Sequence, residues 1–164
     1  MGLAMSYLRV PPVLEGEPDP GRIARHVFGT ADWRRRGAAE LFDLGWAWQA
    51  VHYLVTGDPW DGRQPEADLV CGGRLLTEDG ADELGLDVIY LAPERVKPAA
   101  DHLAATPFAK LAERYDPAAP SSLPASWTPA RDKVLKPAYD GLATFFGAAA
   151  AEGQAVNKVM FPEG

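Results

Sequence analysis

The sequence predicts an α+β fold: a small mixed β-sheet packed against several helices, in a single domain over residues 1–164. The chain is 47% hydrophobic and 24% charged, which is the composition of an ordinary globular domain. Short β-prone segments lie scattered among helical ones, without the regular alternation of a βαβ fold. No internal repeat and no domain-sized linker divides the chain.

Three segments are predicted as strands. Residues 4–10 are β-prone and end at Pro11-Pro12, because proline cannot continue a strand interior. Residues 88–91 form a short apolar run, and residues 155–160 close the chain. Strands this short are unstable alone, so we expect all three to join one sheet.

The strongest helical signal spans residues 43–56, where apolar side chains recur at helical spacing. Asp43 is the predicted N-cap, and Gly57 is the predicted residue that ends the helix. A second helix is predicted from Pro93, which suits a first helical turn, with Pro98 expected to bend or shorten it.

Two further helices are predicted towards the C-terminus. One follows Thr106-Pro107, and the other begins at Thr128-Pro129 and is interrupted by Pro137.

Trp46 and Tyr53 lie almost opposite the apolar stripe of the predicted 43–56 helix, at about 100° per residue. Two large aromatic side chains left bare would make an unusual apolar patch. We therefore expect this face to be covered by the loop at residues 15–38 or by a second copy of the chain. The second case predicts a homodimer through the Trp46/Tyr53 face.

The net charge of −7 is concentrated in one part of the sequence. Residues 58–102 carry eleven acids against four bases, whereas the segments on either side each carry six of both. An acidic segment either keeps the protein soluble or attracts a basic protein partner. The acids predicted to contact such a partner are Glu78, Asp79, Asp82 and Glu83.

Other partner classes are not expected. The only basic cluster is Arg34–Arg36, and nucleic-acid binding needs a broader basic face. No signal peptide is read, and the longest apolar run, Gly141–Ala151, is too short for a membrane span. A single cysteine excludes an internal disulfide. We expect a cytoplasmic protein.

No motif for phosphate, dinucleotide, zinc or serine-hydrolase chemistry is present in the sequence. We therefore predict no cofactor and no metal. Cys71 is either a nucleophile or a small buried thiol, and its apolar and glycine neighbours favour the thiol. His52 is either a base or a histidine at the edge of the core, hydrogen-bonded to the backbone.

Several ordered blocks resemble the YfbM-like family of bacterial domains of unknown function. The most distinctive is DLGWAWQAVHYLVTG at 43–57, although Trp46 stands where family members usually carry a polar or basic residue. The resemblance implies a single α+β domain and no particular activity. The other blocks are MGLAMSYLRV at 1–10, CGG at 71–73, YLAPERV at 90–96, ERYDP at 113–117, Trp127, and FFGAAAAEGQAV at 145–156.

Two function classes follow from these observations. The first is a non-catalytic binding module, such as an inhibitor, an immunity-type partner or a regulator, that uses the acidic surface. The alternative is a small enzyme with a motif-poor pocket around His52 and Asp116. If a pocket exists, we expect it between the 43–56 helix and the 115–127 segment. Its predicted lining is Trp48, His52, Tyr115, Asp116 and Trp127.

Overall fold

A five-stranded antiparallel sheet forms one layer of the fold. The computed structural model describes residues 2–10, 22, 41–58, 60–75, 87–114 and 131–163. The strand order is β2-β1-β5-β4-β3, and the first and last strands of the chain are neighbours. The strands are β1 (Gly2–Val10), β2 (Leu41–Gly45), β3 (Arg74–Leu75), β4 (Asp87–Leu91) and β5 (Ala155–Glu163).

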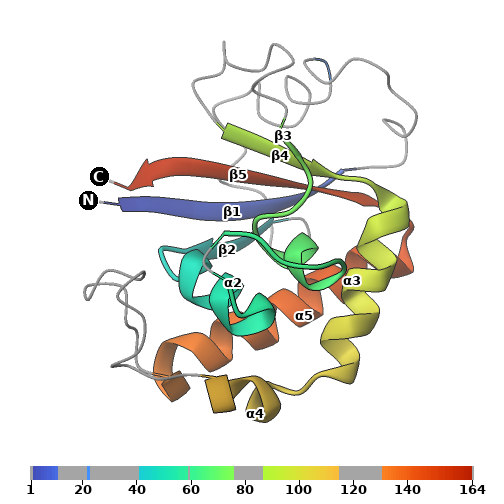
Figure 1. Ribbon diagram of the computed structural model, residues 1–164. Coiled ribbons are helices and arrows are strands. Elements are labelled where there is room, and N and C mark those ends of the chain that lie inside the picture. Colours follow the sequence, from blue (N-terminus) through green and yellow to red (C-terminus); the bar gives the residue numbers. More distant parts are fainter. Residues whose placement is uncertain are drawn as a thin grey trace.

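The α+β class is confirmed, and the three predicted strands join one sheet as β1, β4 and β5. The sheet is not mixed as expected: in the part of the chain that the structure describes, all four strand pairings are antiparallel. Each strand runs opposite to its neighbours, so no pair needs the crossover connection that parallel strands require. Gly2 pairs with Glu163, which places the two chain ends side by side (Figure 1).

The helices gather on one side of this sheet (Figure 1). None of the helices described is both long and apolar enough to cross a lipid bilayer. The α-helices are α2 (Trp48–Thr56), α3 (Pro93–Ala105), α4 (Phe108–Leu111) and α5 (Lys136–Ala151). Shorter turns are the 3₁₀ segments η3 (Glu66–Leu69) and η6 (Ala112–Arg114) and the π-helical segment η8 (Arg131–Leu135).

The core lies between the sheet and α5. Tyr7 of β1 is fully buried, and its ring meets those of Phe145 and Phe146 edge-on, at centroid distances of 6.0 and 6.1 Å. Gly141 lets α5 approach β2 closely, because a Cβ atom there would lie 2.5 Å from the ring of Phe42. Aromatic rings from both layers therefore interlock at the centre of the fold.

The predicted 43–56 helix is in fact a strand followed by a shorter helix. Asp43 is not an N-cap: it lies in β2, and its carboxylate accepts hydrogen bonds from the Ser6 hydroxyl at 3.1 Å and the Gly45 N–H at 2.9 Å. β2 is the edge strand and pairs with β1, and the chain turns at Gly45 (φ +62°) before α2 begins. Gly57 ends α2 as predicted, in the left-handed conformation.

Pro98 does not shorten α3, which runs through it to Ala105. Proline removes the hydrogen bond to the carbonyl four residues earlier, that of Glu94. Both residues are exposed, so this carbonyl lies on the side of the helix that meets water. Pro137 stands in the first turn of α5, where π-helical geometry gives way to α-helix.

Candidate functional site

A segment between α2 and β3, residues 60–72, is held to the core by buried side chains from three elements. We call this segment the strap. In each contact a side chain bonds a main-chain carbonyl oxygen of the strap, and all three side chains are fully buried. The contacts are His52 Nε2 of α2 with Asp61 at 2.9 Å, Tyr7 Oη of β1 with Leu69 at 2.7 Å, and Lys158 Nζ of β5 with Asp68 at 2.5 Å and Gly72 at 2.6 Å.

Lys158 is the most unusual of these side chains, since a lysine is seldom buried completely. Burial lowers its pKa to about 7, although Asp68 and Cys71 favour its charged form. Sequence reasoning missed this residue. A period of two in β5 could not reveal it, because both faces of this strand are buried: Val156 and Lys158 lie on one face, Asn157 and Val159 on the other.

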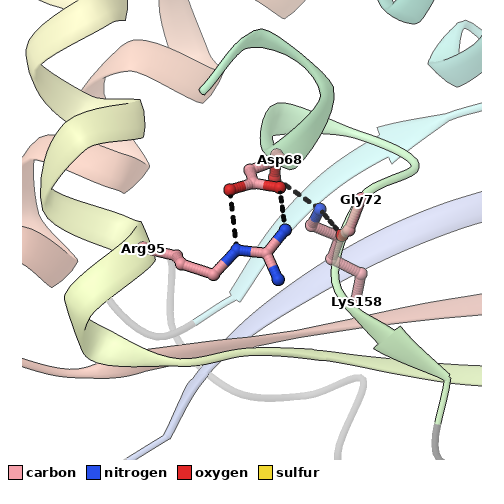
Figure 2. Close-up of polar contacts among 4 residues, drawn as sticks. All are labelled: Asp68, Gly72, Arg95 and Lys158. Carbon is pink, nitrogen blue, oxygen red and sulfur yellow. Dashed lines mark hydrogen bonds and ion pairs between the residues drawn. The ribbon is translucent and has the colours of Figure 1, made fainter. Parts of the chain in front are cut away.

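The carboxylate of Asp68 does not bond Lys158. It makes two hydrogen bonds with the guanidinium of Arg95 on α3, one of them from Nε at 2.9 Å (Figure 2). Only 2% of the Asp68 side chain is exposed, against 35% for Arg95. Asp68 thus joins η3 to α3 through its side chain and to β5 through its carbonyl.

Two glycines of the CGG block allow this close packing. A Cβ atom at Gly72 would lie 2.6 Å from Oδ1 of Asp68 and 2.7 Å from the carbonyl oxygen of Ala67. At Gly73, φ is +127° and a Cβ atom would lie 2.7 Å from the side chain of Ile89. The block therefore serves the backbone geometry at the end of the strap.

Cys71 and His52 are both held in their neutral forms. Burial raises the pKa of the Cys71 thiol to about 11, which agrees with a structural thiol and not with a nucleophile. Burial also lowers the pKa of His52, and this outweighs the opposing effect of its bond to the Asp61 carbonyl. His52 is a buried histidine bonded to the backbone, as the sequence favoured.

Three residues with exposed apolar side chains are linked to the buried Trp48, near the first residue of the strap. Trp60 is 58% exposed, Trp46 39% and Leu3 38%. All three adjoin the buried Trp48: its Nε1 donates to the Leu3 carbonyl at 2.9 Å, its ring centroid lies 5.8 Å from that of Trp60, and Trp46 precedes it by two residues. We call Leu3, Trp46 and Trp60 the aromatic surface.

The sequence matches the family model described as a domain of unknown function, DUF1877, over residues 1–157. The chain belongs to the DUF1877 family. Its fold is similar to the crystal structure of YfbM from Escherichia coli, a protein of unknown function, with a TM-score of 0.61 and 12% sequence identity. The similarity covers 96% of this chain and 99% of that one. No curated protein matches the sequence.

Membership of DUF1877 confirms the resemblance to YfbM-like domains. The predicted pocket remains a prediction. Its members Trp48 and His52 are both buried in α2, whereas Tyr115, Asp116 and Trp127 lie outside the described residues. The same holds for the acidic residues Glu78, Asp79, Asp82 and Glu83. The enzyme alternative depends on Asp116 and is likewise untested.

The placement of Trp46 on a helix opposite the apolar stripe is wrong, because α2 begins only at Trp48. Trp46 lies in the turn between β2 and α2, and its ring remains partly exposed in the single chain. Tyr53 is half-buried on α2. The homodimer through these two residues stays a prediction.

Proposed function

We propose that this DUF1877 protein is a non-catalytic binding module, and that its aromatic surface accepts a basic segment of a partner protein. The observation that carries the proposal is that most of the exposed large apolar side chains belong to residues linked to Trp48 by contact or by sequence. Of the four large hydrophobic side chains exposed in the described part of the chain, three form the aromatic surface. Contiguous apolar patches on soluble proteins mark interaction sites, and tryptophan is enriched among residues that dominate binding energy.

Carboxylates beside both tryptophans support a basic partner. Asp43 bonds the N–H of Gly45, next to Trp46. Asp58 bonds the N–H groups of Trp60 and Asp61, and these bonds lower its pKa. A lysine or arginine on a partner would meet an indole face and a carboxylate together. The net charge of −7 would favour its approach.

The test is affinity capture from the native host with four immobilised proteins: the wild type, Trp46→Ala, Trp60→Ala and Leu75→Ala. Leu75 is the matched control, because it is 39% exposed but lies in β3, at the opposite edge of the sheet. We expect wild type and Leu75→Ala to retain the same basic protein, and Trp60→Ala to retain at least about tenfold less, as for a binding hot spot.

The electrostatic part of the proposal has its own control. Capture should weaken when the salt concentration rises from about 50 to about 500 mM, because exposed charges are then screened. Equal capture by wild type and both tryptophan variants would exclude the aromatic surface. A dimer in light scattering that Trp46→Ala converts to a monomer would instead assign the surface to a second copy of the chain.

A further inference from the structure

We propose that His52 is a pH-sensitive latch that holds the strap, and with it Trp60, in place at neutral pH and releases it in acid. This regulation rests on the proposed function, because Trp60 is the most exposed member of the aromatic surface. The latch itself is a property of the single chain and can be tested without a partner.

One face of α2 carries the side chains that contact residues 58–61. Trp48, His52 and Thr56 are four residues apart and so lie on one helix face. They contact the segment that follows α2: Trp48 contacts the ring of Trp60, and His52 bonds the Asp61 carbonyl. The Thr56 hydroxyl bonds both the N–H and the carbonyl of Asp58, just before the strap. Of the three α2 residues, only His52 changes its charge near neutral pH.

The two ring nitrogens of His52 have different surroundings. Nε2 lies 2.9 Å from the Asp61 carbonyl oxygen, so in the neutral ring Nε2–H donates and Nδ1 carries no proton. Nδ1 is buried and has no hydrogen-bond partner among the described residues. Protonation would create an N–H there without an acceptor, together with a buried positive charge, and both are costly.

The charged groups around His52 do not remove this cost. Lys158 approaches from β5 and disfavours a second positive charge, while Asp58 and Asp61 favour it. Lys158 itself faces Asp68, Cys71 and Arg95. Burial has the largest effect, and it lowers the pKa of His52 below its ordinary value of 6.5.

The direction of the response follows from linkage. A released His52 titrates near 6.5, whereas the latched residue titrates lower. The closed strap is therefore fully stable above about pH 6.5 and loses stability below it, because the open state binds the additional proton. The opening equilibrium constant increases by at most about tenfold per pH unit until the pKa of the closed state is reached.

Hydrogen exchange of the strap amides at about pH 7 and pH 5.5, corrected for intrinsic exchange, measures this opening. Three proteins are compared: wild type, His52→Gln and His102→Gln. Glutamine can donate to the Asp61 carbonyl but does not titrate. His102→Gln tests the competing histidine, because His102 of α3 also reaches the strap, 3.6 Å from a carboxylate oxygen of Glu66. We expect acid to open the strap several-fold in wild type and His102→Gln, and to have no such effect in His52→Gln.

A second readout follows two residues of the wild type directly. The imidazole signals of His52 and the indole N–H signal of Trp60, assigned with Trp60→Phe, should change together in an NMR pH titration. The proposal is overturned if His52 titrates at its ordinary value while the strap stays closed. It is also overturned if His102→Gln abolishes the response.

Partner capture at the two pH values separates this inference from the proposed function. A strap that opens in acid in a chain that captures no basic protein supports the latch and contradicts the binding proposal. Capture that is equal at both pH values, with a strap that stays closed, contradicts the latch and leaves the binding proposal standing.

Discussion

The side-chain nitrogen of Lys158 lies 2.5 Å from the main-chain carbonyl oxygen of Asp68, while the carboxylate of Asp68 pairs with Arg95 instead. Among the described residues, the buried lysine is therefore bound by neutral carbonyl groups and not by a carboxylate. Carbonyl oxygens accept hydrogen bonds from a neutral amine as well as from an ammonium group. This explains how Lys158 can lose its proton near neutral pH without losing its role in holding the strap.

The first prediction concerns the pH dependence of stability. The pKa of Lys158 is about 7 in the folded protein and 10.5 in an exposed lysine, so the unfolded chain keeps a proton that the folded one loses. The free energy of unfolding should therefore rise between pH 7 and 9, by at most about 1.4 kcal/mol per pH unit from this group. Urea denaturation at three pH values measures the slope.

Comparison with a variant isolates this effect from other titrations. Lys158→Met should remove most of the rise, whereas Lys97→Met should keep it, because Lys97 is 72% exposed and pairs with Asp101 on the surface. The measurements stop at pH 9. Above this pH the unfolded chain loses protons from Cys71 and Tyr7 that the folded chain keeps, because folding raises the pKa of both groups, and this lowers the free energy of unfolding. An unchanged slope in Lys158→Met would show that the lysine does not titrate as described.

The second prediction concerns the ion pair between η3 and α3. Asp68→Asn leaves the guanidinium of Arg95 without its carboxylate. Breaking a fully buried pair costs about 3–5 kcal/mol, but Arg95 is 35% exposed, so water can solvate it in part. We expect a loss of roughly 2–3 kcal/mol of unfolding free energy in denaturant titration. The matched control is Asp101→Asn, which breaks the exposed pair with Lys97. It should change the unfolding free energy by less than about 1 kcal/mol.

The third prediction tests the close approach at Gly72. Gly72→Ala would force its methyl group against Asp68 and the Ala67 carbonyl, and overpacking of this kind costs roughly 1–3 kcal/mol. Gly147→Ala is the matched control: it lies in α5 with open space around the added atom, so it should stabilise the helix by up to about 1 kcal/mol. Equal thermal stabilities of the two variants would contradict this account of the CGG block.

The sequence was sufficient to predict three of the five described strands, β1, β4 and β5, but not β2, β3 or the start of α2. Composition alone predicts the strands at residues 4–10, 88–91 and 155–160. Strands this short are not stable alone, so we expect them to pair within one sheet. The start of α2 could not be found in the same way. Apolar spacing continues through Leu44 and Ala47, and only the pairing of Leu41–Gly45 with β1 makes that stretch a strand. Tertiary contacts here override a local helical pattern.

The candidate site was only partly visible in the sequence. Trp46, Trp48, His52 and Cys71 attracted attention because of their residue types. Lys158 did not, because a charged residue at the end of a chain is usually exposed. The strap is bonded by side chains that lie up to 151 positions apart in the sequence, those of Tyr7, His52 and Lys158. Only the folded chain brings these side chains together.

The last prediction concerns Cys71, whose raised pKa determines its reactivity. The thiolate is the nucleophile in alkylation, and a pKa of about 11 instead of 9.0 lowers the thiolate fraction at pH 8 by about 100-fold. Iodoacetamide should therefore modify native Cys71 about 100-fold more slowly than the urea-unfolded chain, followed by intact mass spectrometry. A native rate equal to that of the unfolded chain would mean that Cys71 is an accessible, activated thiol, and would revive its reading as a nucleophile.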